Sequence, residues 1–255
     1  MSRTTPEARW AICLEPRRAA AVRLLCLPHA GAGAEVFRGW GRELPEWVEP
    51  HAIQLPGRGM RLREPLPTDL GRLADELVCA LEPLTGREFA LFGHSMGALL
   101  AFELARRLER QDRPLAHLFV AGYGAPHVYR SRTTLHAMSH DAAVAELRRT
   151  RAVPDLVLDD EGMSRIFVPI VQSDIGMCVK HGVDVDAEPI AAPLSAFGGA
   201  LDAEVPAEAV AAWGDLTTAP FRLRILPGDH FFPAGARSEL LAAVGTDLAQ
   251  RRVAA

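Results

Sequence analysis

The fold is decided by residues 89–98, FALFGHSMGA, which join an apolar run, a sharp turn and the start of a helical pattern. The four apolar residues 89–92 predict a buried strand, and the pattern from about Met96 to Arg110 predicts a helix. Between them lies a Gly-x-Ser-x-Gly motif centred on Ser95. The glycines two before and two after a nucleophilic serine remove side chains that would clash in such a turn. Ser95 is therefore the candidate nucleophile, exposed at the carboxyl end of its strand.

Strands and helices alternate on both sides of this motif, which predicts an α/β fold. The expected strands are residues 24–27, 51–55, 118–121, 194–197 and 221–226, and the expected helices are 35–44, 69–84 and 236–250. Such alternation places the strands in a mostly parallel central sheet with helices on both faces. With the serine turn at its centre, the chain resembles the α/β-hydrolase fold, and residues 1–255 are predicted to form one domain.

Residues 124–193 break the alternation. They show helical patterns at 139–149 and 159–179, the second interrupted by Pro169, but no convincing strand. Because the block lies between two sheet strands, we expect an insertion that forms a helical lid over the site. The alternative is a set of extra core helices with no gating role.

A serine needs a neighbouring base to act as a nucleophile at neutral pH, and histidine titrates in that range. In this fold the base comes last in the chain, after the serine and the acid. His230 follows the strand 221–226 by a short loop, whereas His181 lies in the insertion with no strand before it. His230 is therefore the candidate base. His94, next to Ser95, should point away from it, and we expect it either to pack in the core or to support the catalytic residues from behind.

The acid should follow the preceding strand, residues 194–197. Asp202 lies in the loop after that strand and is expected to orient His230 and stabilise its charged form. Asp229 is a rival by proximity, but an immediate neighbour of His230 would hardly reach the far side of its ring. Asp215 is expected at a helix end.

The oxyanion of an acyl-transfer reaction needs two backbone N–H donors. Met96, directly after the nucleophile, should give one, and Ala30 in the loop 28–33, PHAGAG, should give the other. This loop matches neither the dinucleotide fingerprint nor the P-loop. The four cysteines are scattered with no metal-binding spacing. The sequence thus predicts no cofactor and no metal.

Composition excludes some classes of function. The net charge of -4 lacks the basic excess of a nucleic-acid-binding protein. No apolar run approaches the roughly 20 residues that a membrane span requires. The polar residues 1–9 lack the apolar core of a signal peptide, so we expect a cytoplasmic protein.

Taken together, several segments resemble the type II thioesterases that accompany modular polyketide synthases and nonribosomal peptide synthetases. They occur in family order across about residues 23–248, and they are 27–33 (LPHAGAG), 54–58 (QLPGR), 92–98 (FGHSMGA), 197–202 (FGGALD) and 228–232 (GDHFF). The resemblance implies hydrolysis of acyl thioesters from the phosphopantetheine arm of acyl or peptidyl carrier proteins, which removes aberrant acyl groups. It supports Ser95, Asp202 and His230 as the triad and Ala30 and Met96 as the oxyanion donors, and we expect a monomer.

The sequence departs from the family pattern at 150–154, at 172–174 and at Asp229, positions that affect the lid and the pocket. Arginines 58, 61 and 63 and arginines 148, 149 and 151 form two basic clusters. Either cluster could help to dock an acidic carrier protein; the alternative is a solvated surface.

Two other functions use the same residues. A small-molecule esterase would need the same triad, although the HGGG-type loop common in lipases and esterases is absent. A hydrolase-like binding protein without turnover would have no need for an intact Ser-Asp-His set.

Overall fold

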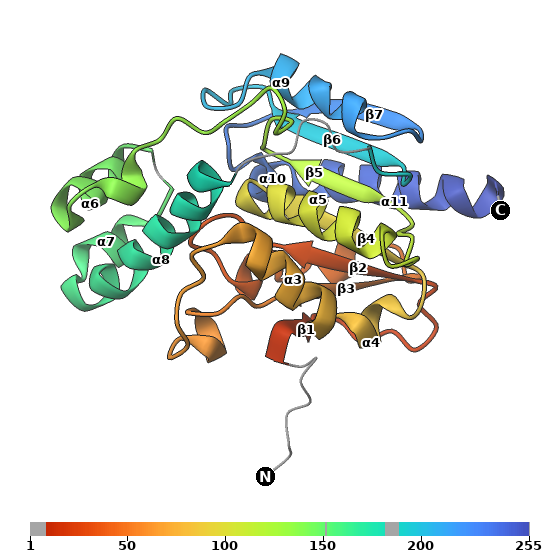
Figure 1. Cartoon of the computed structure of the whole chain (residues 1–255), viewed down its shortest axis with the longest axis horizontal. Coiled ribbons are helices and arrows are strands. Elements are labelled where there is room, and N and C mark those ends of the chain that lie inside the picture. The colour runs from red at the N-terminus through yellow and green to blue at the C-terminus, as the bar shows by residue number, and fades with distance from the viewer. Residues whose placement is uncertain (1–8, 151, 182–188, 255) are drawn as a thin grey trace, which may run out of the picture.

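Seven strands form one sheet in a computed structural model that describes residues 9–150, 152–181 and 189–254 (Figure 1). The strand order is β1-β3-β2-β4-β5-β6-β7. The strands are β1 (Ala11–Cys13), β2 (Val22–Leu27), β3 (Val48–Ile53), β4 (Phe89–His94), β5 (Leu118–Ala121), β6 (Leu194–Gly199) and β7 (Phe221–Leu226). All neighbours are parallel except β1, which pairs antiparallel with β3. The predicted mostly parallel α/β sheet is confirmed, and only β1 was missed.

The central strands are buried on both faces, as continuous apolar runs predict. Along β4, Phe89 and Leu91 belong to one apolar cluster, and Ala90 and Phe92 belong to another. The first cluster includes the apolar faces of α3 (Leu70–Ala80) and α5 (Met96–Glu109). The second includes those of α2 (Trp40–Glu43) and α11 (Arg237–Ala254). Helices therefore cover both faces of the sheet, as predicted.

Two predicted helices are shorter than expected. The pattern at 35–44 gives a 3-10 turn, η1 (Ala34–Phe37), and then α2, because Gly39 takes a left-handed conformation with φ 85° between them. The pattern at 69–84 gives α3, whose first turn is capped by Asp69 accepting from Arg72 N at 2.8 Å, and then the short α4 (Glu82–Thr85). The remaining short elements outside the insertion are η2 (Gly59–Arg61), α9 (Ala207–Ala211), η4 (Ala212–Leu216) and α10 (Phe232–Gly235).

The segment between β5 and β6 is helical, as predicted. It contains η3 (Leu135–Ala137), α6 (His140–Arg149), α7 (Asp155–Asp159) and α8 (Glu161–Lys180). Figure 1 shows α6, α7 and α8 grouped beside the end of the sheet where α5 begins. The expected interruption at Pro169 was wrong, because α8 runs unbroken through it. Residues 151 and 182–188 of the predicted insertion lie outside the described residues.

These helices share an apolar cluster of their own, which includes Leu135, Leu147, Leu158 and Val168. The insertion is thus held together by its own packing as well as by the sheet. Across the described residues, no helix has both the length and the apolar character needed to cross a membrane.

Candidate active site

Ser95 occupies a strained turn between β4 and α5. Its backbone has φ 55° and ψ -119°, and its N–H donates to Ala121 O at 2.8 Å. A Cβ at Gly93 would lie 2.0 Å from Gly97 O, and one at Gly97 would lie 2.2 Å from Leu27 O. Such strain in a non-glycine residue persists only where the surroundings enforce it, and it is concentrated at functional sites. The turn has the form that the Gly-x-Ser-x-Gly motif predicted.

Three of the predicted residues meet at hydrogen-bonding distance. His230 Nε2 lies 3.0 Å from Ser95 Oγ, and His230 Nδ1 lies 2.9 Å from Asp202 Oδ2. The other carboxylate oxygen, Asp202 Oδ1, accepts from Glu204 N at 2.9 Å and Val205 N at 3.1 Å. The carboxylate is thus fixed by its own loop, and the imidazole spans the gap between it and the serine hydroxyl.

The rival candidates lie elsewhere. Asp229 is exposed, and its Oδ1 accepts from Phe231 N at 2.9 Å. Asp215 lies in η4, 3.3 Å from His127 Nε2. His181 follows the end of α8 and lies 3.5 Å from Glu103.

The charge of Asp202 controls the protonation of His230. Burial alone would lower the pKa of His230, but the hydrogen bond and the charge of Asp202, with Glu204 and Asp229, outweigh it and raise that pKa above its ordinary value. Burial would raise the pKa of Asp202, but its bond to His230 and the two backbone donors hold it below the usual range. The pair therefore combines a carboxylate that stays ionised with an imidazole of increased basicity.

His94 has a role that the sequence did not specify. Its side chain is buried, and its Nε2 donates to the backbone carbonyl of His230 at 2.9 Å. Burial, with the nearby His29 and His230 rings, holds the pKa of His94 well below its ordinary value, so the ring is neutral and can donate. His94 thus ties the strand end that carries Ser95 to the loop that carries the candidate base. Of the two roles expected for His94, packing or support of the catalytic residues, this contact fits the second.

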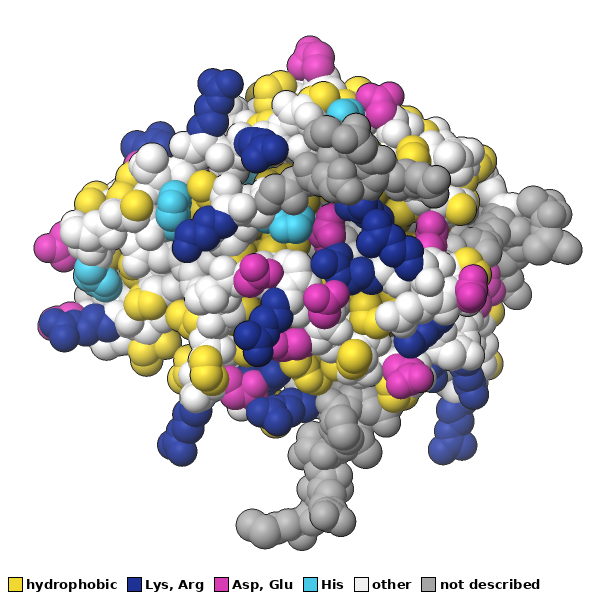
Figure 2. All heavy atoms as spheres, viewed as in Figure 1, with side chains coloured by type: hydrophobic (Ala, Val, Ile, Leu, Met, Phe, Trp, Pro, Cys, Tyr) yellow, Lys and Arg dark blue, Asp and Glu magenta, His cyan; other side chains and the backbone are white. Residues whose placement is uncertain are grey.

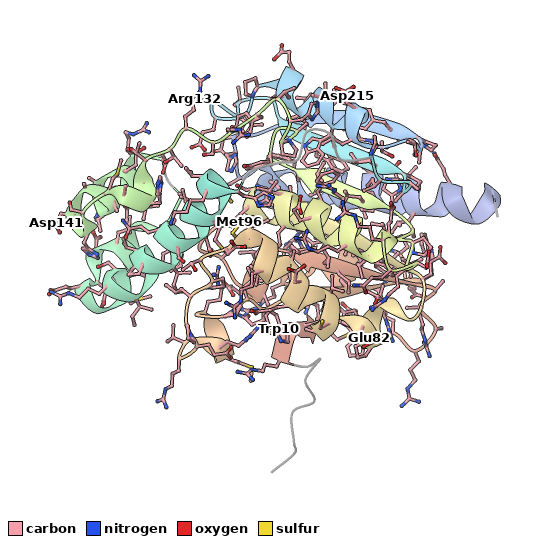
Figure 3. The ribbon with its side chains drawn as sticks, in the orientation of Figure 1. Trp10, Glu82, Met96, Arg132, Asp141 and Asp215 are labelled. Carbon is pink, nitrogen blue, oxygen red and sulfur yellow. The ribbon has the colours of Figure 1, made fainter. Side chains whose placement is uncertain are left out.

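The predicted oxyanion donors lie beside the serine. Ala30 and Met96 line the same small cavity as Ser95 and His230, with a volume of about 110 Å³. Figure 3 places Met96 at the end of α5 that faces the α6–α8 block. Within the described part of the chain, neither the Ala30 N–H nor the Met96 N–H donates a hydrogen bond to another residue. Both donors are therefore available to a ligand oxygen.

The cavity adjoins a larger groove of about 1170 Å³. Ser131, Thr133, Glu146 and Glu204 line both spaces. Most of the other residues that line the small cavity are apolar and belong to the insertion, including Leu147, Val171 and Ile175. The insertion thus forms one side of the space above Ser95.

Most arginines of the two clusters are paired with carboxylates, whereas Arg63 is exposed. Arg58 and Arg61 are buried: Arg58 pairs with Asp174 at 2.6 and 2.7 Å, and Arg61 pairs with Glu64 at 2.7 Å. In the insertion, Arg148 pairs with Asp155 and Asp159, and Arg149 pairs with Glu146. Arg151 lies outside the described residues. On the face seen in Figure 2, basic and acidic side chains are intermixed rather than segregated. Burial of Arg58 and Arg61 contradicts both a docking role and a solvated surface role for these two residues. For the exposed Arg63, Arg148 and Arg149, docking stays a prediction.

One set of metal-type ligands occurs among the described residues, away from Ser95. Cys13, Glu49 and His51 bring ligand atoms within 4.8 Å of one another at the β1–β3 edge. Glu49 already accepts from Arg17 N and from His51 Nε2, both at 2.8 Å. These contacts make the group a hydrogen-bonded cluster of the sheet edge.

Comparison with known proteins places the chain among enzymes. Residues 22–248 match the thioesterase domain family. The chain is 35% identical over 235 residues to the gramicidin S biosynthesis protein GrsT of Aneurinibacillus migulanus, covering 91% of each. It is similar to the RedJ thioesterase from the prodiginine biosynthetic pathway in Streptomyces coelicolor, with 39% identity, TM-score 0.85 and 91% and 92% coverage. It is also similar to the type II thioesterase BorB from the borrelidin biosynthetic cluster, with 32% identity, TM-score 0.86 and 97% and 100% coverage.

Proposed function

The chain belongs to the thioesterase domain family, and from this premise we propose that it is a type II thioesterase of polyketide or nonribosomal peptide biosynthesis. Its substrates are acyl groups held as thioesters on the phosphopantetheine arm of acyl or peptidyl carrier proteins. The observation that carries the proposal is the unbroken Asp202–His230–Ser95 chain of hydrogen bonds beside the cavity, in a protein similar to GrsT, RedJ and BorB. An enzyme that hydrolyses such carrier-bound thioesters can remove aberrant acyl groups, and we propose this as its role.

In the first step His230 Nε2 takes the proton of Ser95 Oγ while the oxygen attacks the thioester carbonyl carbon. Asp202 holds the proton of the ring on Nδ1 and stabilises the imidazolium. The carbonyl oxygen becomes an oxyanion that accepts from the N–H groups of Ala30 and Met96. The C–S bond then breaks, His230 returns its proton to the pantetheine sulfur, and the acyl group remains on Ser95.

In the second step water replaces the thiol. His230 takes a proton from the water as its oxygen attacks the acyl-enzyme carbonyl, and the same two N–H groups hold the oxyanion. The ester bond to Ser95 breaks, the serine oxygen recovers its proton from His230, and a free acid leaves. The two steps require only the substrate, one water molecule and these side chains and backbone N–H groups.

The two adjoining spaces suit the two ends of the substrate. We assign the small cavity with its apolar walls to the acyl group and the larger groove to the pantetheine arm, because the four shared residues make the groove continuous with the space above Ser95. In this proposal the insertion acts as a lid, since its helices form the walls that an acyl chain contacts. We also propose that the enzyme is monomeric and acts in the cytoplasm.

The test compares one acyl group on three leaving groups: a carrier protein, a free pantetheine and an aryl alcohol. The proposal predicts the highest kcat/KM for the carrier-bound thioester. A small-molecule esterase would hydrolyse the aryl ester fastest and gain nothing from the carrier. A binding protein without turnover would leave Ser95 unlabelled by a fluorophosphonate, whereas the proposed enzyme is labelled there.

A further inference from the structure

Helix α8 packs directly against the loop that carries the Ala30 N–H. Gly31 has φ +80°, and a Cβ there would lie 2.5 Å from Val171 Cγ2 and 3.3 Å from the ring of Phe167. Both side chains belong to α8. The insertion therefore touches the loop one residue beyond the proposed oxyanion donor, and a side chain at position 31 would strain the backbone and force Val171 to shift.

A buried carboxylate reinforces this contact. Asp174, also on α8, has no solvent exposure, and its Oδ2 accepts from Gly31 N at 2.8 Å. The same oxygen accepts from Arg58 Nη1 at 2.6 Å, and Oδ1 accepts from Arg58 Nη2 at 2.7 Å. The carboxylate thus binds the loop and a guanidinium at once, in the two-pronged geometry that arginine favours.

Arg58 holds the same loop from its other side. Its Nη1 also donates to Ala32 O at 3.1 Å, and its backbone carbonyl accepts from Gln54 Nε2 at 3.0 Å. The loop is therefore held at Gly31 through its N–H and at Ala32 through its carbonyl. Ala30 directly precedes these two anchored residues in the chain and lines the small cavity together with Ser95.

We infer that Asp174 and Arg58 are positioning residues that fix the Ala30 N–H for the oxyanion and couple the position of helix α8 to that donor. The inference rests on the proposed function, in which Ala30 N–H binds the oxyanion. A donor misplaced by a fraction of an ångström loses most of its effect, because oxyanion stabilisation depends on groups held in place before the reaction.

The coupling limits how the insertion can open. Movement of α8 at Asp174 would leave two buried charges without partners, which is strongly unfavourable. The part of α8 from Phe167 to Asp174 therefore stays with the sheet. Opening of the acyl cavity is left to α6, α7 and η3.

Asp174→Asn tests the inference with little change of shape. The carboxylate accepts three hydrogen bonds through two oxygens, whereas asparagine offers one acceptor oxygen and turns an NH2 donor toward either Arg58 or Gly31. Loss of a whole oxyanion donor lowers kcat by about 10²- to 10³-fold. Because Asp174→Asn misplaces the donor without removing it, we expect kcat on an aryl ester to fall by less, about 10- to 100-fold. KM should stay within about threefold, because the change affects the transition state and not substrate binding.

The decisive readout is binding of an alkylboronic acid, which forms a tetrahedral adduct with the serine and places an oxygen at the oxyanion position. Its Kd should rise by the same factor as kcat/KM falls, because it mimics the transition state. The matched control is Asp247→Asn. Asp247 is equally buried and pairs with Arg224 at 2.7 Å through both oxygens, but it lies on α11 and contacts β6 and β7. This control should lower thermal stability and leave the boronate Kd unchanged.

The outcomes separate this inference from the proposed function. If the wild type binds the boronate and Asp174→Asn binds it equally well, the inference is overturned and the proposed function stands. If the wild type neither binds the boronate nor unloads an acyl carrier protein, the proposed function fails. Should Asp174→Asn not fold, Arg58→Lys decides: it keeps the charge beside Asp174 but loses the paired geometry, and an unchanged boronate Kd would overturn the inference.

Discussion

Replacing Asp202 by asparagine should reverse the tautomer of His230. Asp202 Oδ1 accepts from Glu204 N and Val205 N, and Oδ2 accepts from His230 Nδ1. Asparagine has one acceptor oxygen, and two backbone donors compete for it against one imidazole. The oxygen therefore stays with the loop, and the amide NH2 faces His230.

The consequence falls on the bond to Ser95. With an NH2 donor at its Nδ1, the imidazole carries its proton on Nε2, which lies 3.0 Å from Ser95 Oγ and can no longer accept the serine proton. Loss of the base in this way lowers kcat by about 10³- to 10⁴-fold. At about 1.36 kcal/mol per decade, the transition state is destabilised by roughly 4–5.5 kcal/mol.

The assay is kcat/KM against pH for an acyl thioester. In the wild type the pKa of His230 is raised, so the rate should fall on the acid side at a pH above the ordinary histidine value of about 6.5. In Asp202→Asn the charge that raised the pKa of His230 is gone, so burial should lower this pKa. The pH at which kcat/KM falls on the acid side should therefore be lower than in the wild type. Asp229→Asn removes no bond to the ring and only the smallest of the charges that raise the pKa of His230. It is the control, and its kcat/KM above the acid limb should stay within about twofold of the wild type. A loss of less than about tenfold in Asp202→Asn would refute the reasoning.

Further predictions concern stability. Gly97→Ala places a Cβ against Leu27 O, so urea unfolding should show a loss of at least about 1–3 kcal/mol, whereas Gly235→Ala, where a Cβ meets nothing within 4 Å, should show none. Equal losses in the two variants would contradict the close-packed turn. For His94, whose pKa is lowered by burial, the unfolded chain binds a proton that the folded protein does not, so this residue's contribution to stability is complete above about pH 6.5 and falls as the pH drops below it. In His94→Gln that decline should be shallower by up to about 1.36 kcal/mol per pH unit; an unchanged slope would show that His94 titrates normally.

The sheet was predictable because its central strands are buried on both faces and therefore appear as apolar runs. Because the apolar runs mark where each strand ends, they also showed that Ser95 and His230 each follow a strand. Chain order and position in a loop after a strand were therefore enough to choose the residues that the structure brings together. Strand β1 was missed because three residues at an edge give no pattern. Gly39 split a predicted helix, since apolar periodicity does not register a backbone that must turn left-handed.

Other features depend on contacts between distant residues. Pro169 was expected to interrupt α8, but the helix continues because neighbouring residues such as Val168 and Val171 are packed in the insertion's core. Arg58 and Asp174 are 116 positions apart, and each alone suggests a surface charge. Only the fold shows that they neutralise each other beside the loop of Ala30. His94 likewise gained a role through the backbone of a residue 136 positions away.

The measurement that tests the central claim most directly is unloading of an acyl carrier protein by wild type and Ser95→Ala, followed by the mass of the carrier. The account predicts that the wild type removes the acyl group and leaves the phosphopantetheine arm with a free thiol, with a short-lived acyl ester on Ser95. Ser95→Ala should leave the carrier loaded while keeping the folded stability of the wild type. Continued unloading by Ser95→Ala at the wild-type rate, or failure of the wild type to unload any acyl carrier that it is offered, would contradict the account.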